Sequence, residues 1–417
     1  MSRPIGVAVI GAGMAGRSHA AGYRTAPTLY GPGLPEVRLV SVADANPELA
    51  ADTARRYGYQ RSDSTWQAVA AADDVDVVSV VLANPLHREV VEALLAAGKH
   101  VLCEKPLAPS VEDAEAMVAA AEAAPVQSAV GFTFRRSPAI AAVRDLVGSG
   151  ALGRPVQLGG RYWCDYAVDP EGPMSWRYKG GPGSGALADI GSHLVDLAEF
   201  LCGPIESVRG AVLSTVVTER AVPLGAVVGH AKARLSDVRE PVENEDVVSF
   251  TARFVSGATA TLTASRAAFG HANSLGFDLF ATDGAASFDL DRPGEIQVAD
   301  RSVGAPTRGT RTVTIGPDHP YLTGGLPMDF PGVGYGQNDL FSFQARAFLE
   351  QVAGIEGLPP CPPLSAGLHN LRLLRSVVES AGRGGAEVAV RPEPTGTDPA
   401  STGPTSTDPA RSHATVS

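Results

Sequence analysis

Apolar and polar positions alternate in blocks along the first 130 residues. Continuous apolar runs, typical of strands that are buried on both faces, occur at 5–10, 37–43, 75–83, 100–104 and 125–132. Amphipathic stretches between them predict helices, most clearly at 17–24, 86–97 and 110–123. Because strands that alternate with helices form parallel sheets covered on both faces, residues 1–130 are predicted to be a doubly wound α/β domain.

The pattern changes near residue 155. Strand-like runs at 154–163, 205–217, 246–254, 258–267, 275–282 and 285–291 follow one another, several joined by glycine-containing turns at 255–257 and 282–284. Such turns are hairpin signals and predict a large, mainly antiparallel open-faced sheet. Helices near 339–354 and 366–381 are expected to close this second domain, and 386–390 reads as a last strand. We therefore predict an α+β domain over residues 131–390 for substrate binding and oligomerisation.

Composition and charge narrow the possible partners. The net charge of −11 argues against nucleic acid or an anionic membrane surface. No apolar run approaches the ~20 residues that a membrane helix needs. The four cysteines are far apart, which favours reduced thiols in the cytoplasm over a disulfide framework or a metal site. Residues 391–417 are rich in Pro, Thr and Ser and are expected to be a disordered tail.

A glycine-rich turn follows the first strand and opens the first helix. It matches the pattern GxGxxG and consists of Gly11, Ala12, Gly13, Met14, Ala15 and Gly16. In this context the motif predicts a Rossmann dinucleotide site, with pyrophosphate at the helix N-terminus. Asp44 ends the second strand, where a carboxylate binds ribose hydroxyls and repels a 2′-phosphate. The predicted cofactor is therefore NAD, with NADP less favoured.

A second group of polar residues lies on a predicted helix in the middle of the chain. Asp189, His193 and Asp196 are four and three residues apart and so share one stripe of that helix. The same pattern also fits a histidine packed in a core beside a solvated carboxylate. For Asp196 we expect solvation rather than catalysis. Lys105, in the stretch LCEKPLA, follows a strand at the edge of the sheet where ligands bind. The structural alternative for this lysine is a surface ion pair with Glu104.

These motifs in this order resemble the Gfo/Idh/MocA family, named after glucose–fructose oxidoreductase and inositol dehydrogenase. The resemblance covers about residues 4–390, and DYAVDPEGPMSWRY and GYGQNDLF look most like inositol and sugar dehydrogenases, including the levoglucosan type. It implies that Lys105, Asp189 and His193 surround the nicotinamide ring. It also implies further cofactor contacts from Ala83, Asn84, His87, Glu104, Trp176 and Arg177.

The implied activity is oxidation of a secondary ring hydroxyl of a sugar or inositol. In this interpretation His193 takes the hydroxyl proton, Asp189 holds one of its ring nitrogens, and Lys105 polarises the reacting oxygen. Further substrate contacts are predicted from Phe134, Trp163 and Asp165, although sheet packing explains the last two equally well. Two alternatives stay open: an enzyme that retains NAD and uses transient oxidation for elimination, epimerisation or glycoside cleavage, and a non-catalytic dinucleotide-binding regulator. A homodimer or homotetramer is expected through the open face of the sheet, which we expect to be apolar.

Overall fold

The first domain is built on a six-stranded parallel sheet in the order β3-β2-β1-β4-β5-β6. In the computed structural model, residues 3–225, 233–301 and 309–390 are described, and the predicted tail lies outside them. The strands are β1 (Ile5–Ile10), β2 (Val37–Ala43), β3 (Arg61–Asp63), β4 (Val77–Val80), β5 (His100–Cys103) and β6 (Ser128–Val130). This order runs outward from β1 in both directions, so the prediction of a doubly wound sheet is confirmed.

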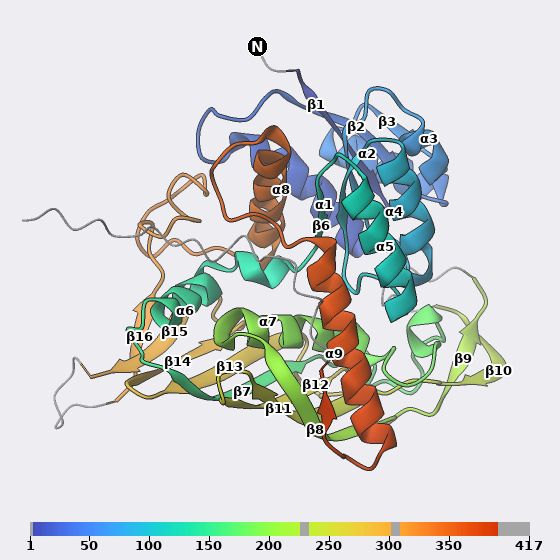
Figure 1. The fold of residues 1–417 in the computed structure, drawn as a ribbon. Coiled ribbons are helices and arrows are strands. Elements are labelled where there is room, and N and C mark those ends of the chain that lie inside the picture. Colours follow the sequence, from blue (N-terminus) through green and yellow to red (C-terminus); the bar gives the residue numbers. More distant parts are fainter. Residues whose placement is uncertain (1–2, 226–232, 302–308, 391–417) are drawn as a thin grey trace, which may run out of the picture.

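Helices connect these strands and cover both faces of the sheet (Figure 1). They are α1 (Met14–Thr25), α2 (Pro47–Tyr57), α3 (Trp66–Ala70), α4 (His87–Ala96) and α5 (Val111–Ala123), with short 3₁₀ turns η1 (Ala26–Thr28) and η2 (Asn84–Leu86). Local chemistry fixes their ends. The Asn46 side chain accepts the N–H groups of Glu48 and Leu49 at the start of α2, and Ser110 accepts the Asp113 N–H in α5.

The second domain contains a nine-stranded sheet in the order β16-β15-β14-β13-β7-β12-β11-β8-β17. Its strands are β7 (Pro155–Trp163), β8 (Ile205–Ser214), β11 (Val247–Phe254), β12 (Thr259–Ser265), β13 (Ser274–Ala281), β14 (Gly284–Asp289), β15 (Glu295–Asp300), β16 (Arg311–Thr314) and β17 (Val388–Ala389). Every pair is antiparallel except β7 and β12. A separate hairpin, β9 (Glu219–Pro223) with β10 (Leu235–Pro241), projects from one end (Figure 1).

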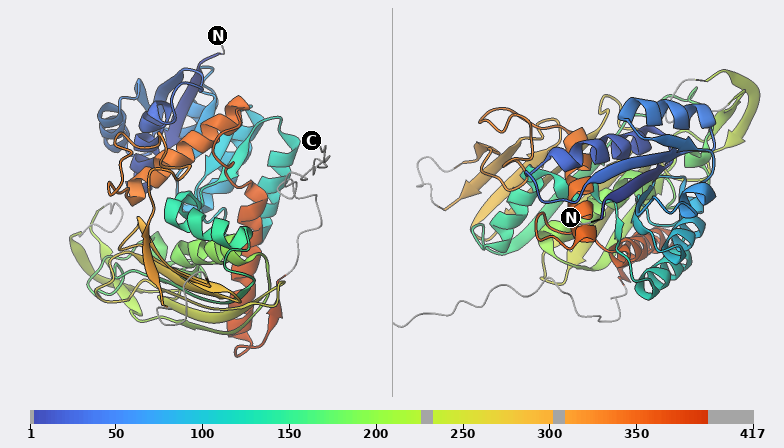
Figure 2. Two further views of the ribbon diagram at one scale, coloured as in Figure 1. Left: turned by 90° about the vertical axis from the view of Figure 1, so that its left-hand side faces the viewer. Right: turned by 90° about the horizontal axis from the view of Figure 1, so that it is seen from above.

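Helices lie between the two sheets, and the far face of the large sheet has no described helix over it (Figures 1 and 2). The inner layer holds α6 (Pro138–Gly148), the π-helical turn η5 (Leu187–Gly191) and α7 (Ser192–Cys202), with 3₁₀ turns η3 (Thr133–Arg136) and η4 (Trp176–Tyr178) nearby in sequence. Leu194 of α7 lies over Gly160 of β7, where an added methyl carbon would be only 3.0 Å from its Cδ1. Because the described helices cover only the inner face, the large sheet is open on its other face, as predicted.

The expectation that the last two helices close the second domain is wrong for the first of these helices. Helix α8 (Gln337–Ala353) packs against α1, and its Ala345 and Phe348 belong to the buried cluster that contains Tyr23 of the first domain. Helix α9 (Leu364–Gly382) packs against both α5 and β8. The chain thus returns to the Rossmann sheet after building the large one, which ties the two sheets together.

The four cysteines are buried free thiols, as expected from their spacing. Among the described residues, the structure has no helix that is both long enough and apolar enough to cross a membrane.

Candidate functional site

The glycine turn has the geometry that a dinucleotide cradle requires. Gly11 has a φ of +100°, and a Cβ there would lie 2.0 Å from the Val81 carbonyl oxygen. A Cβ at Gly16 would lie 1.8 Å from the Gly11 oxygen, so helix and turn pack in direct backbone contact. At Gly13 an added Cβ would meet nothing within 4 Å. The turn is therefore closed at its two ends and open at the middle glycine, where pyrophosphate approaches in this motif.

Asp44 lies beside this turn, at the end of β2. Its Oδ2 accepts the Ala12 N–H at 2.8 Å, and its Oδ1 accepts the Asn46 N–H at 2.8 Å. These two bonds hold the carboxylate against the glycine turn, while its remaining lone pairs can accept further donors. The carboxylate is thus fixed beside the turn, at the position where the sequence predicts an adenosine ribose.

Lys105 follows β5 and reaches across to the second domain. Its Nζ donates to the Asp189 backbone oxygen at 2.6 Å and lies 3.5 Å from Asp189 Oδ1. The Tyr166 hydroxyl donates to the other carboxylate oxygen of Asp189 at 2.6 Å. The Lys105 side chain is only 14% exposed, so this charge is held in a largely desolvated position. An ion pair with the neighbouring Glu104, the structural alternative for this lysine, does not form.

His193 lies in the first turn of α7, next to this cluster. Phe134 packs edge-on against its ring with centroids 5.0 Å apart, and Tyr162 lies 6.2 Å away. Burial lowers the pKa of His193 well below its ordinary value; the positive charge of Lys105 acts in the same direction, whereas Asp189 opposes them. The ring is therefore neutral near neutral pH, the state in which it accepts a proton.

The structure does not show the expected hydrogen bond from a ring N–H of His193 to the Asp189 carboxylate. His193 Nδ1 is enclosed and has no hydrogen-bond partner among the described residues. Asp189 is turned to Tyr166 and Lys105, and it acts on His193 through its charge. The reason lies in η5: Asp189 is inside this π-helical turn, so its spacing from His193 in α7 differs from that in an ideal α-helix.

Asp196 belongs to a different interaction, and the expectation that it is solvated is wrong. It is 5% exposed and accepts a bidentate pair of bonds from Arg135, with the shortest N–O distance 2.6 Å. A buried carboxylate needs such a partner, because it otherwise pays a large desolvation cost. The pair joins η3 to α7, behind the cluster of Lys105 and His193.

The loop after β4 borders the glycine turn, and its predicted cofactor-binding residues differ in their exposure. Ala83 and Asn84 are partly exposed where η2 begins. His87 is fully buried, with Nδ1 3.1 Å from the Leu107 oxygen and Nε2 3.0 Å from the Leu82 oxygen. Burial lowers its pKa. The contact with Leu107 joins this loop to the one after β5, and the contact with Leu82 lies within the loop itself.

No contact with Lys105 or His193 is seen for three other predicted residues. Trp163 contacts Arg161 and His271 on the face of the large sheet opposite to Tyr162 and His193. Asp165 is partly exposed just beyond β7. Trp176 is 49% exposed in η4.

Arg177 stacks on Trp176, and its backbone oxygen accepts a bond from Arg266 at 2.9 Å. The structure shows neither residue of this pair in contact with Lys105.

Tyr166 is not among the predicted site residues, yet its hydroxyl contacts Asp189 directly. It lies beyond the regular strand, so no alternation rule indicates where it faces. Its pKa is raised well above the ordinary value by burial and by the charge of Asp189, so it acts as a hydrogen-bond donor. Glu104 also turns away from the cleft, toward His19 of α1.

Comparisons with known proteins agree with this geometry. Residues 5–132 match the oxidoreductase family with an NAD-binding Rossmann fold, and residues 140–287 match the GFO/IDH/MocA C-terminal domain. Levoglucosan dehydrogenase of Pseudarthrobacter phenanthrenivorans is 38% identical over 383 residues, which are 91% of this chain and 96% of that protein. Inositol 2-dehydrogenase of Rhizobium meliloti is 28% identical over 293 residues, 70% of this chain and 77% of that protein.

Solved structures show the same likeness across both sheets. A levoglucosan dehydrogenase in complex with NADH and levoglucosan matches with a TM-score of 0.83 and 35% identity, covering 93% of this chain and 100% of that one.

Proposed function

Because the chain belongs to the Gfo/Idh/MocA family of NAD-binding oxidoreductases, we propose that it oxidises a secondary ring hydroxyl of a sugar or inositol to a ketone with NAD. One observation carries the proposal: Lys105 from the Rossmann domain lies against Asp189 and next to His193 of the second domain. A cation, a neutral base and a dinucleotide cradle at one sheet edge are the components that alcohol oxidation requires.

The residues present fit NAD. The open space at Gly13 and the free N–H groups of the first turn of α1 would receive the pyrophosphate. Asp44 would accept bonds from the adenosine ribose, and its negative charge would disfavour a 2′-phosphate. When bound, NAD supplies the hydride acceptor.

The side chains of Lys105, Asp189 and His193 then take part in the proton transfer. We place its transfer at Nε2 of His193, because Nδ1 is enclosed by protein atoms. The lowered pKa of His193 keeps Nε2 free to accept the hydroxyl proton near neutral pH. Lys105 donates a hydrogen bond to the reacting oxygen and stabilises negative charge on it, while Tyr166 keeps Asp189 in place beside the ammonium group.

The proposed substrate class rests on the relatives. Levoglucosan and inositol are both rings that carry several secondary hydroxyls, and they appear in the names of proteins similar to this chain over most of its length. Levoglucosan is the first substrate to test, since that relative matches at 38% identity.

The test is an NADH-absorbance screen of the purified protein against levoglucosan, inositols and common hexoses. We expect NADH to accumulate with at least one ring polyol and to vanish with His193→Ala. NAD that copurifies with the protein and turns over substrate without net NADH would contradict a simple dehydrogenase. It would support instead the enzyme that retains its cofactor.

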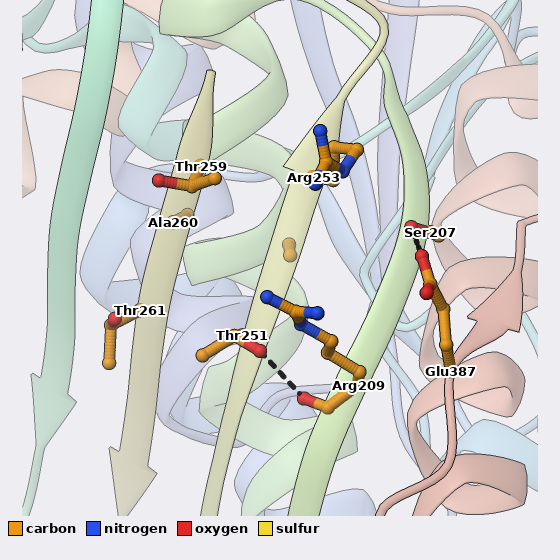
Figure 3. Close-up of a pocket in the computed structure, with 9 residues that line it drawn as sticks. Ser207, Arg209, Thr251, Arg253, Thr259, Ala260, Thr261 and Glu387 are labelled. Carbon is orange, nitrogen blue, oxygen red and sulfur yellow. Dashed lines mark hydrogen bonds between the residues drawn. The ribbon is translucent and has the colours of Figure 1, made fainter. Parts of the chain in front are cut away.

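We also propose that the uncovered face of the large sheet pairs with a second copy. The expectation that this face is apolar is wrong, because its outward residues on β11 and β12 include Thr251, Arg253, Thr259 and Thr261. They line a hollow of about 170 Å³. Figure 3 shows their side chains on the two neighbouring strands. The small threonine side chains on these strands leave a flat surface that suits packing of one sheet on another. The exposed side chains of Val212 and Phe280 contribute apolar area to the interface.

Light scattering tests the pairing. We expect a dimer or tetramer at micromolar concentration, weakened when Thr261→Glu places a charge in the middle of the face. A monomeric wild-type protein at that concentration would refute it.

A further inference from the structure

A buried network of hydrogen bonds connects helix α1, which begins at the glycine turn, to Glu104, the residue before Lys105. His19 of α1 is 2% exposed, and its Nε2 lies 2.9 Å from Glu104 Oε1. Its Nδ1 lies 3.1 Å from the Ser79 hydroxyl of β4, which is also 3.1 Å from the Tyr23 hydroxyl. These contacts join α1, β4 and the end of β5, and they use residues that the proposed reaction does not otherwise need.

Glu104 links this network of hydrogen bonds to Lys105. Burial alone raises its pKa, but the hydrogen bond and charge of His19 and the charge of Lys105 outweigh burial, so the net pKa is lowered. Its second oxygen, Oε2, accepts the backbone N–H of Lys105 at 3.2 Å. A Cβ at Gly131 would lie 2.8 Å from Oε1, so the space beside the carboxylate is kept by a glycine. The carboxylate is ionised, enclosed and bonded on both oxygens.

We propose that Glu104 and His19 are positioning residues that fix the backbone of Lys105 relative to α1. The inference rests on the proposed function, because it assigns the pair a task for the Lys105 side chain. Helix α1 begins at the pyrophosphate cradle, and Lys105 must be placed correctly over the cofactor's other end. One buried hydrogen bond between these elements, from His19 to Glu104, sets that distance. A misplacement of about 1 Å costs about a hundredfold in rate.

Substitutions that keep size test the pair. Glu104→Gln keeps the shape but removes the charge, and His19→Gln keeps an N–H donor of similar reach, whereas His19→Ala removes it. We expect Glu104→Gln and His19→Ala to lower kcat about ten- to hundredfold with little change in the Kd of NAD. His19→Gln should retain more activity than His19→Ala. Glu112→Gln, which removes an exposed carboxylate paired with Arg375, serves as the control.

Combining Glu104→Gln with Lys105→Ala distinguishes a positioning role from general support of the fold. If Glu104 acts through Lys105, Glu104→Gln should lower kcat no further once Lys105→Ala is present. An equal loss in both backgrounds, or a lower melting temperature with unchanged kcat, would overturn the proposal.

Hydrogen–deuterium exchange without substrate separates this inference from the proposed function. Amides around Lys105 should exchange faster in Glu104→Gln and His19→Ala than in the wild type and the Glu112→Gln control. That result would stand even if no sugar were oxidised. Unchanged exchange in both variants would overturn the positioning role, whatever the substrate proves to be.

Discussion

The glycine turn allows the fold and the cofactor site to be perturbed separately. Gly16→Ala places a Cβ 1.8 Å from the Gly11 oxygen, and real Cβ atoms stay at least 3.0 Å from such atoms, so turn and helix must separate by 3.0 − 1.8 = 1.2 Å or more. Overpacking of this kind costs about 1–3 kcal/mol or more. At about 2–4 °C per kcal/mol for a domain of this order of size, the melting temperature should fall by several degrees.

Gly13→Ala should do the opposite. Its Cβ meets no protein atom within 4 Å, and the poorer N-cap costs less than about 1 kcal/mol. The new methyl group, however, occupies the space through which the pyrophosphate approaches. We expect a weakening of NAD binding by at least about tenfold, which is about 1.4 kcal/mol, with a nearly unchanged melting temperature.

Differential scanning fluorimetry without cofactor and titration of NAD by calorimetry measure the two effects. Gly148→Ala is the matched control, since a Cβ there also meets nothing within 4 Å and the residue lies in α6. Wild-type NAD affinity in Gly13→Ala would refute the assignment of the open glycine to pyrophosphate. A fully stable Gly16→Ala would refute the packing argument.

Two further predictions concern the cofactor and pH. NAD should be preferred over NADP in kcat/KM, and Asp44→Ser should reduce that preference by removing the charge that faces a 2′-phosphate; a wild-type enzyme indifferent to the two cofactors would contradict this. Activity should fall in acid as His193 becomes protonated, and only below the ordinary histidine pKa, because burial and Lys105 lower it. Lys105→Met should therefore move the acid limb of kcat to higher pH, and Asp189→Asn to lower pH; shifts in the same direction would contradict the assignment.

Much of the fold could be predicted because it depends on local pattern. Continuous apolar runs such as the one in β1, followed by the turn at Gly11–Gly16, define the Rossmann sheet. Asp44 was identifiable for the same reason, since parallel strands end at one edge. Lys105 and His193 were identifiable from motif and resemblance rather than from periodicity.

What the sequence did not indicate depends on contacts between distant segments. The π-helical turn before α7 changes the direction of Asp189, and no spacing rule for an α-helix includes it. The partner of Asp196 is Arg135, 61 residues earlier. Helix α8 has an apolar face that fits either domain, and only the packing on Tyr23 decides that it returns to the first. His19 reads as a polar residue on a surface helix until Glu104 is placed beneath it.

The central claim is that Lys105 and His193 serve one proton transfer in an NAD-dependent oxidation. The most direct test is kcat for Lys105→Ala, His193→Ala and the double variant, with the Kd of NAD measured for each. We predict that each single change lowers kcat by about 10²–10⁴-fold, that the double variant is far less than additive, and that NAD affinity changes little. Near-full turnover by His193→Ala across about three pH units around neutrality would contradict the account.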